Sequence, residues 1–333
     1  MMRATLVTAG EVLQLRSELG WVDRLMREAI GTELRPSDAG GAVLEASVHV
    51  IVETASEPFH GPGWEPFARD AWRREREIVL ANAGSSGFDL LLSELAPSGP
   101  RAPTFTFRWR PPPSVRAAAW ALRSRARLLA RATLLMYPSM WVAGLRGRVP
   151  LHACACIAGE AVPLLAGPSG LGKSTLVDTE VRAGGHAIGD NLCVGDGTSV
   201  WGVVEPVRLE GLGGRRMPHG RGEAPLLHRI DRLEPDRVVV LKRGSEALGR
   251  SRSCAPEEAA RSLIAGTYTA GELRRYWGFA AALAAGTGVG PVHPAVGAVA
   301  DRFAERLPGV EVILPASPGA RLADLLALAE TSP

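Results

Sequence analysis

One glycine-rich segment holds the residues best suited to chemistry in this chain. From Gly167 to Ser174 it reads Gly-Pro-Ser-Gly-Leu-Gly-Lys-Ser and matches the pattern GxxxxGK[ST] in full. In this pattern backbone N–H groups surround phosphate oxygens, the lysine binds the β- and γ-phosphates, and the hydroxyl ligates Mg²⁺. Lys173 is one of only two lysines among 38 lysine and arginine residues. A compact ammonium on a flexible stem fits over phosphates where a planar guanidinium does not, so the segment predicts a nucleoside triphosphate site.

The residues on either side have the order that such a site requires. The apolar run at residues 161–166 predicts a strand, and the stretch from Ser174 to about Gly184 can be helical. A strand, a glycine loop and a helix start would bring backbone N–H groups and the positive end of the helix dipole to one point. The residues expected to bind the nucleotide are Gly167, Pro168, Ser169, Gly170, Leu171, Gly172, Lys173, Ser174 and Thr175.

An acidic residue follows at a distance that narrows the class of protein. A short apolar stretch at residues 186–189 leads to Asp190 and then Asn191. The downstream apolar strand at residues 237–243 ends instead in Lys242 and Arg243, whereas a transporter ATPase needs an acid there. No LSGGQ-like helix start and no NKxD motif of a GTPase occurs in the chain. The pattern therefore favours a kinase over either of those classes.

Residues 152–191 resemble the catalytic core of HPr kinase/phosphorylase and of the wider group of HPr-kinase-like P-loop kinases. The pattern of that family is a histidine, a strand pair, GxSGxGKS[ET], a helix and a G-H-x-x-x-x-D-[DN] strand. His152 matches the histidine, and Asp190 matches the first aspartate of the paired acids. The residues that match the loop are Ser169, Gly170, Gly172, Lys173 and Ser174.

The resemblance implies a role for each matched residue. Asp190 is the candidate base that accepts the proton of an attacking hydroxyl, and Lys173 would neutralise charge that develops on the transferred phosphoryl group. Ser174, Asp190 and Asn191 are the candidate Mg²⁺ ligands. His152 would orient Asp190 or contact a phosphate oxygen. Two simpler interpretations stay open, a satisfied core histidine at His152 and a turn cap at Asp190.

Phosphate clamps are harder to assign because the arginines are numerous. Arg208 is the preferred candidate, since it follows the strand that comes after the acidic pair. Arg215, Arg216, Lys242 and Arg243 are weaker candidates, each of which is explained equally well as a surface charge.

The chain also departs from the family pattern. Asn191 replaces the second acid, and Thr175 stands where the bifunctional enzymes carry an acid. The family signature Arg-Gly-Leu-Gly-Ile is absent, and residues 209–214 resemble it only weakly. A divergent kinase is therefore expected, and HPr as the acceptor, reverse phosphorylase activity and a hexameric assembly are left open.

The function expected from these residues is ATP/Mg²⁺-dependent transfer of a γ-phosphoryl group to a hydroxyl, with serine or threonine of a protein or peptide as the first choice of acceptor. Two alternatives remain, a kinase for a small alcohol-bearing molecule and an ATP-sensing regulator that transfers nothing. GTP or pyrophosphate in place of ATP, and a homo-oligomer, also stay open.

The composition of the chain is that of a soluble globular protein, and its few cysteines together with the expected use of ATP predict a cytoplasmic setting. Its 333 residues are 46% hydrophobic and 22% charged, and no apolar segment or N-terminal pattern predicts a membrane span or a secretory signal. The net charge of +3 does not argue for nucleic acid, and arginine runs such as Arg123, Arg125, Arg127 and Arg131 are interpreted as solvated helix faces. Neither a nucleic acid nor a membrane is expected as a partner. The four cysteines lack metal-binding spacing and are expected to be small buried thiols.

The proline run at residues 111–113 predicts a boundary between two domains. Residues 1–112 are expected to form an α+β domain that helps to present the acceptor, with helices near residues 12–30 and 64–80 and strands near 43–53 and 104–107. Residues 113–333 are expected to form the catalytic domain, which opens with a long helix from Ser114 that Pro138 ends. Its later helices are expected at 257–267, 271–285, 296–306 and 322–330, and its strands at 151–157, 162–166, 186–188, 200–204, 238–241 and 310–314. The predicted fold class is α/β, a P-loop kinase core of HPr-kinase type with an N-terminal α+β domain.

Overall fold

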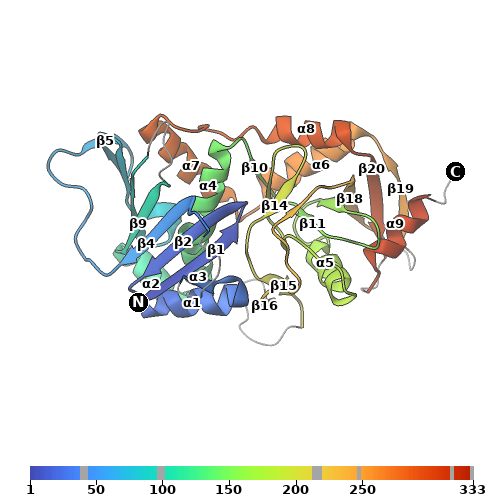
Figure 1. Ribbon diagram of the computed structural model, residues 1–333, viewed down its shortest axis with the longest axis horizontal. Helices are drawn as coiled ribbons and strands as arrows, with labels where there is room; N and C mark the ends of the chain where they lie inside the picture. Colours follow the sequence, from blue (N-terminus) through green and yellow to red (C-terminus); the bar gives the residue numbers. More distant parts are fainter. Residues whose placement is uncertain (38–43, 96–101, 212–219, 246–248, 316–318, 331–333) are drawn as a thin grey trace. The chain divides into compact units, whose positions relative to one another are not determined.

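The computed structural model describes residues 1–37, 44–95, 102–211, 220–245, 249–315 and 319–330, and it is a mixed α/β protein with several sheets (Figure 1). This confirms the α/β class at that coarse level. The described residues form two compact units. Unit 1 combines Met1–Arg146 with Arg275–His293, and unit 2 combines residues 147–211, 221–274 and 294–330.

Unit 1 is built on a nine-stranded mixed sheet. The first two strands form an antiparallel hairpin whose side chains alternate between the buried and the exposed face, and Ala9 and Gly10 turn the chain with positive φ. The neighbours β2, β4 and β9 run parallel, and β9 to β5 continue antiparallel. In sheet order the strands are β3 (Arg35–Pro36), β1 (Met2–Thr8), β2 (Glu11–Ser17), β4 (Val48–Glu53), β9 (Thr104–Trp109), β8 (Phe88–Ser93), β7 (Glu77–Leu80), β6 (Ala71–Arg74) and β5 (Glu65–Ala68).

Helices of unit 1 come from distant parts of the sequence. Helix α4 packs on β2 and β4, and the ring of its Tyr137 lies 5.6 Å from that of Tyr276 and 5.4 Å from that of Phe279, both on α7. The helices are α1 (Gly20–Ile30), α2 (Pro113–Ala121), α3 (Arg123–Arg131), α4 (Tyr137–Leu145) and α7 (Arg274–Thr287), with short 3₁₀ turns at Gly31–Glu33 and Ala83–Ser85 and a π-helical turn at Ala132–Met136.

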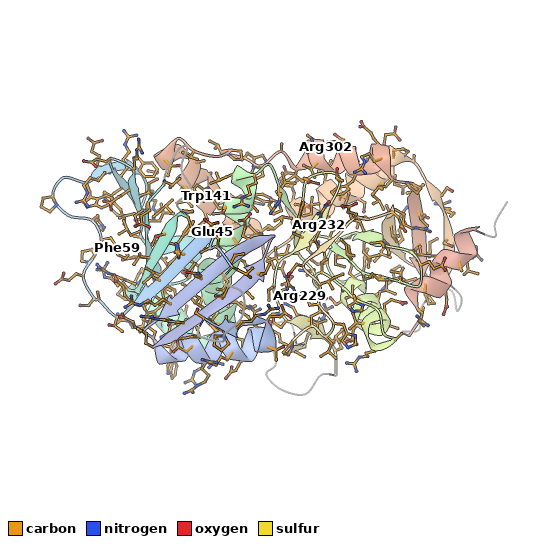
Figure 2. The ribbon with its side chains drawn as sticks, viewed as in Figure 1. Glu45, Phe59, Trp141, Arg229, Arg232 and Arg302 are labelled. Carbon is orange, nitrogen blue, oxygen red and sulfur yellow. The ribbon has the colours of Figure 1, made fainter. Side chains whose placement is uncertain are left out.

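The helical stretch Arg123–Leu145 is long and apolar enough to cross a membrane by length and composition alone. It is 72% buried over its most apolar part. The ring centroid of its Trp141, which Figure 2 labels, lies 5.9 Å from that of Phe105 in the sheet. A buried core helix meets the same criterion, and these contacts place the stretch in the core of unit 1.

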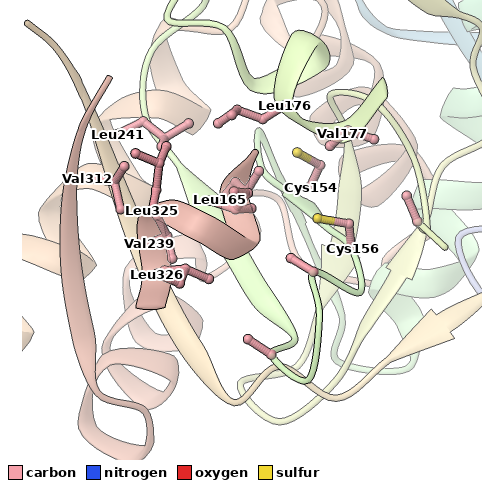
Figure 3. Packing of buried hydrophobic residues seen from close by; sticks show 14 of the residues in the cluster. Cys154, Cys156, Leu165, Leu176, Val177, Val239, Leu241, Val312, Leu325 and Leu326 are labelled. Atoms are coloured by element: carbon pink, nitrogen blue, oxygen red, sulfur yellow. The ribbon is translucent and has the colours of Figure 1, made fainter. Parts of the chain in front are cut away.

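Unit 2 is centred on a five-stranded sheet in which β12, β18 and β20 are parallel. The apolar residues of these strands face α5 and α9, whose Leu176, Val177, Leu325 and Leu326 complete a buried cluster (Figure 3). In sheet order the strands are β11 (Cys154–Ala155), β12 (Pro163–Ala166), β18 (Arg237–Arg243), β20 (Gly309–Leu314) and β19 (Arg250–Cys254), and the helices are α5 (Lys173–Arg182) and α9 (Leu322–Glu330).

The rest of unit 2 consists of two smaller sheets and two helices. Arg302 of α8 donates two hydrogen bonds to the carbonyl oxygen of Asp196, at 3.1 and 2.9 Å, and so ties that helix to the turn before β14 (Figure 2). The elements are β10 (Val149–Leu151), β13 (Cys193–Gly195), β14 (Val200–Gly202) and β17 (Arg232–Leu233), the pair β15 (Val207–Leu209) and β16 (Gly222–Ala224), and the helices α6 (Pro256–Thr269) and α8 (Val296–Arg306).

Several sequence predictions are wrong in unit 1. The expected charged helix at residues 64–80 is the three strands β5, β6 and β7, because Asp70 and Glu75 take positive φ and turn the chain between them. Residues 11–17 are strand β2, and only Gly20–Ile30 of the expected first helix is helical. Pro138 does not end its helix, since the π-helical turn precedes it and Pro138 lies in the first turn of α4, where a missing N–H costs nothing.

The two compact units also divide the chain differently from the expected boundary after residue 112. Residues 113–146 and most of α7 lie in unit 1, since the buried apolar side chains of the stretch from Ala130 to Ala143 pack with its sheet and with α7. In unit 2 the expected strand at residues 186–188 is reduced to isolated bridges at Ala187.

Candidate functional site

The segment from Gly167 to Gly172, called here the glycine loop, joins β12 to α5. Three of its glycines, Gly167, Gly170 and Gly172, have φ of +144°, +87° and +104°, which other residues adopt only with strain. No heavy atom lies within 4 Å of the position that a Cβ of Gly170 would take, so the space in front of the loop there is open. No side chain caps the N-terminus of α5, and the first N–H groups of a helix have no partner inside it. The loop therefore offers backbone donors and a helix dipole to an anion.

Lys173 begins α5 and turns back over this loop. Its ammonium donates hydrogen bonds to the carbonyl oxygens of Gly167 at 2.6 Å and Pro168 at 3.1 Å. An ammonium has three donors, which leaves one for a ligand. The side chain is buried, and burial lowers the pKa of Lys173, although the neighbouring Cys154 thiol, Asp190 and Glu272 act in the opposite direction.

The Asp190 carboxylate lies beside the start of α5. It accepts hydrogen bonds from the Ser174 hydroxyl and from the Arg208 N–H, the latter at 3.2 Å from Oδ2. Its other oxygen, Oδ1, is buried and has no hydrogen-bond partner in the part of the chain that the structure describes. Burial raises the pKa of Asp190, while the hydrogen bond from Ser174 and the charge of Arg208 oppose that rise. Asp190 is thus a buried carboxylate with one free oxygen, next to the hydroxyl of the predicted phosphate motif.

His152 lies beside the glycine loop. Its Nε2 is 3.3 Å from the Ser169 hydroxyl, and its backbone N–H donates to the Thr267 hydroxyl at 3.0 Å. Its Nδ1 is buried and has no hydrogen-bond partner among the described residues. Burial, assisted by the charge of Lys173, lowers the pKa of His152 to about 4, despite the hydrogen bond with Asn191 and the charge of Glu272. The imidazole is therefore neutral near pH 7.

Arg208 enters the same region from β15, but its guanidinium is already paired. It contacts the carboxylates of Glu205 at 3.1 Å and Glu223 at 3.7 Å, and it also pairs with Glu272. Burial disfavours the charged form, but Glu205 and Glu272 outweigh that effect and raise the pKa of Arg208. Only its backbone N–H reaches Asp190 directly.

The structure brings most of the sequence-predicted residues together. His152, Ser169, Lys173, Ser174, Asp190 and Asn191 are linked by the contacts above. Pro168 and Thr175 are exposed on the loop and on the first turn of α5, and the half-buried Leu171 packs against the core cluster. Lys242 is paired instead with Glu258, at 2.7 Å, and with Glu311. Arg243 is exposed at the end of β18, and Arg215 and Arg216 lie outside the described residues.

Two residues of this region were missed by sequence reasoning. Glu272, in the turn between α6 and α7, pairs with Arg208 and acts electrostatically on both His152 and Lys173. Glu205 is buried and also pairs with Arg208. The arginine on β15 was visible in the sequence, but 64 residues separate it from Glu272, and no motif connects them.

Within the described ranges, no group of three or more His, Cys, Asp or Glu side chains is placed to hold a metal ion. Any Mg²⁺ held by Ser174 and Asp190 would therefore complete its shell with phosphate oxygens and water, which is how Mg²⁺ is usually bound. Comparison of the sequence with models of known protein families, and with curated proteins, gives no match.

Proposed function

We propose that this protein is an ATP/Mg²⁺-dependent kinase of the HPr-kinase-like type that transfers the γ-phosphoryl group to a hydroxyl, with a serine or threonine of a protein or peptide as acceptor. The observation that carries the proposal is the position of Asp190. Its carboxylate is held between the Ser174 hydroxyl and the Arg208 N–H, and one of its oxygens has no partner among the described residues. It lies near the glycine loop and the buried Lys173 that follows this loop.

The residues present fit a bound magnesium nucleotide. The positive-φ glycines, the uncapped α5 and the spare donor of Lys173 suit phosphate oxygens, and Ser174 with Asp190 suits Mg²⁺. Asn191, which the family pattern adds to the metal ligands, instead hydrogen-bonds to His152. When bound, Mg²⁺-ATP would supply the phosphoryl group.

Asp190 accepts the proton of the acceptor hydroxyl while the acceptor oxygen bonds to the γ-phosphorus and the bond to the ADP oxygen breaks. A pKa raised by burial makes its carboxylate a stronger base than an ordinary aspartate. Lys173 binds the phosphate oxygens on which charge develops. The neutral His152 holds the Ser169 side chain and so shapes the loop.

In this proposal Arg208 is a positioning residue rather than a phosphate clamp. Its guanidinium charge is balanced by three carboxylates, whereas its backbone N–H fixes one oxygen of Asp190. Glu205, Glu223 and Glu272 anchor that arginine and through it the carboxylate. We place the activity in the cytoplasm, where ATP is available.

One observation favours a second candidate function, an ATP-sensing regulator without transfer. The Asp190 side chain is only 1% exposed, and the second acid of the family pattern is Asn191. A regulator would bind ATP at the same loop and need no acceptor within reach of the carboxylate.

Incubation of the protein with γ-labelled ATP, Mg²⁺ and candidate acceptors separates these functions. A kinase transfers label to a peptide or to a small alcohol, and the labelled product identifies the acceptor class. ATP binding measured by calorimetry without any transfer would support the regulator, and the absence of nucleotide binding would exclude both. A short precursor peptide encoded beside this gene would be the first acceptor to test.

A further inference from the structure

Helix α2 of unit 1 exposes apolar side chains to solvent. None of its residues is buried, Trp120 is 76% exposed, and Leu122, directly after the helix, is 51% exposed. Valine and alanines make up most of the rest of the helix. Three quarters of the surface of Trp120 is in contact with water, although its ring is large and apolar. Such exposed apolar rings are common where a protein binds a partner.

The charged side chains that α2 and the start of α3 themselves carry are all arginines. Arg116 lies one helical turn before Trp120, so the two side chains share a face, and Arg123 and Arg125 follow within five residues. All three arginines are exposed, and none forms an ion pair in the part of the chain that the structure describes. The sequence contains no aspartate or glutamate from residue 95 to residue 159. A partner for this surface must therefore carry negative charge.

A second arginine-rich segment of unit 1 shows what a solvated surface looks like here. Arg69 and Arg73 are exposed, but each has a carboxylate 3.6 Å away, Asp70 and Glu65 respectively. Charges of both signs alternate there, as on ordinary surfaces. The helix α2 surface, by which we mean Arg116, Trp120 and Leu122 together with Arg123 and Arg125 at the start of α3, is different. Its arginines have no ion pair among the described residues, and it adds the exposed Trp120 and Leu122.

We infer that the helix α2 surface, made of Arg116, Trp120, Leu122, Arg123 and Arg125, docks the protein on an anionic lipid membrane. Tryptophan and leucine would enter the boundary between headgroups and acyl chains, and the arginines would meet lipid phosphates. The combination favours lipid over nucleic acid, because a phosphate backbone needs the arginines but not the apolar side chains. The inference is independent of the proposed kinase activity, and it revises the expectation that no membrane partner is involved.

The test is co-sedimentation of the full chain with vesicles of phosphatidylcholine containing about a quarter phosphatidylglycerol, and with pure phosphatidylcholine vesicles. We expect binding to the anionic vesicles only, weakened by salt. The triple variant R116Q/R123Q/R125Q should bind about a hundredfold more weakly, because each arginine near an anionic surface contributes about a factor of five. The variant W120S/L122S should lose at least about tenfold and keep its salt dependence.

A matched control removes the same charge elsewhere. R69Q/R73Q/R76Q also replaces three exposed arginines of unit 1 and should bind like the unchanged protein. Circular dichroism of each variant establishes that it is folded. Equal binding to neutral vesicles, equal loss in the control, retained binding in both test variants, or displacement from vesicles by duplex DNA would each overturn the inference. So would a concentration-dependent dimer that W120S/L122S abolishes, because a second copy would then cover this surface.

Discussion

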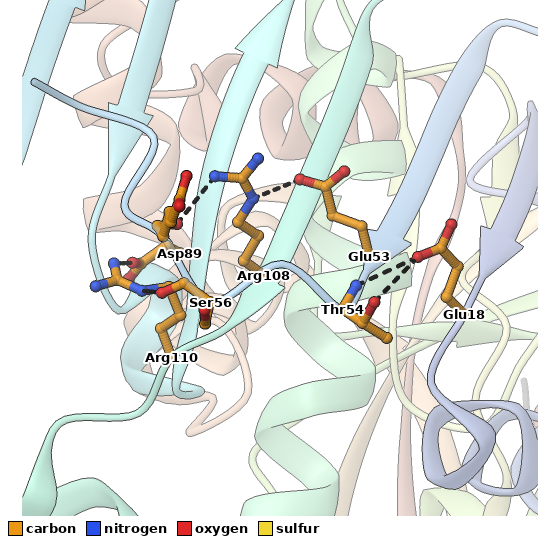
Figure 4. A network of polar contacts seen from close by, with 8 residues as sticks. Glu18, Glu53, Thr54, Ser56, Asp89, Arg108 and Arg110 are labelled. Carbon is orange, nitrogen blue, oxygen red and sulfur yellow. Dashed lines mark hydrogen bonds and ion pairs between the residues drawn. The ribbon is translucent and has the colours of Figure 1, made fainter.

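Two polar regions, one in each unit, use arginines and carboxylates in opposite ways. In unit 1 Arg108 pairs with Glu53 and donates to the carbonyl oxygen of Glu57 at 2.9 Å, while Arg110 pairs with Asp89 and donates to the carbonyl oxygen of Ser56 at 2.7 Å (Figure 4). The second oxygen of Asp89 accepts from the Asn82 N–H at 2.9 Å. Both oxygens of that carboxylate are therefore occupied, and the arginines fasten a loop to the sheet.

The site in unit 2 is more deeply buried and less completely satisfied. Asp190 and His152 each keep one buried polar atom that no described residue hydrogen-bonds, and burial shifts the pKa of both groups. Such atoms are costly unless a ligand or a reaction uses them. The contrast teaches that a closed network holds structure, whereas an open one marks where chemistry is expected.

The sharpest test of this contrast replaces each of the two aspartates, Asp190 and Asp89, by asparagine. Asp190→Asn should lower phosphoryl transfer at least about a hundredfold, because the proton acceptor is lost, and should change ATP affinity little. Transfer of labelled phosphate and calorimetric ATP binding measure the two effects. Asp89→Asn is the matched control and should keep full transfer activity.

Stability separates loss of chemistry from loss of fold in that experiment. A carboxyl whose pKa is raised by burial binds its proton more readily in the folded state, so its charge lowers stability as pH rises. Asp190→Asn should therefore be at least as stable as the unchanged protein at pH 7. A clearly less stable variant would mean that Asp190 has a structural role.

The two lysines provide the next test. Lys173→Arg should weaken ATP binding at least about tenfold, because a guanidinium cannot donate to both loop carbonyls and a phosphate from this position. Lys242→Arg is the control, since Lys242 is half exposed and pairs with carboxylates that an arginine can also reach. Equal ATP affinities for the two variants would contradict the role of the glycine loop.

His152 predicts a pH dependence of folding stability. Its pKa of about 4 lies below the value of about 6.5 in an unfolded chain, so the unfolded state takes up a proton first as pH falls. The contribution of His152 to the free energy of unfolding is complete above about pH 6.5. It is lost as pH falls toward about 4, which lowers that free energy by up to about 3 kcal/mol.

Urea unfolding at several pH values measures this effect. His152→Gln should flatten the stability profile between pH 6.5 and 4, relative to the unchanged protein and to a control at the exposed His186. A profile that the His152 substitution leaves as steep as before would show that the imidazole is not buried in its neutral form.

The closed network should show the smallest and purely structural effect. Asp89→Asn removes the charged partner of Arg110 but keeps a side chain of similar size. The free energy of unfolding of unit 1 should therefore fall by about 1 to 2 kcal/mol. Chemical unfolding measures the change. If Asp89→Asn instead weakened ATP binding while the fold stayed intact, the assignment of a purely structural role to this network would be wrong.

The sequence predicted the elements around the glycine loop well. Strand β12, helix α5, and helices α8 and α9 lie where the apolar patterns placed them. The reason is physical, since a buried parallel strand, a run of positive-φ glycines and an amphipathic helix each leave a local pattern. The proximity of His152, Lys173 and Asp190 followed only from the family resemblance.

What the sequence did not predict depends on distant contacts. The charges of residues 64–80 suit a helix surface, and only the antiparallel neighbours β6 to β8 select strands there. The surroundings of Arg208 are largely non-local, because Glu223 comes from β16 and Glu272 from the turn before α7, and only Glu205 is a neighbour in the sequence. Secondary-structure propensity and residue spacing do not predict contacts between residues that are far apart in the sequence.

Helix α7 has a consequence for the order in which the protein is made. It completes the core of unit 1 beside Tyr137, although it is synthesised after strands β10 to β19, the glycine loop and α6 of unit 2. The first unit therefore cannot finish folding on the ribosome until most of the second has emerged. A gene fragment that stops before residue 275 should yield a protein whose unit 1 lacks α7 and leaves Tyr137 uncovered. We expect this protein to aggregate and to be bound by chaperones.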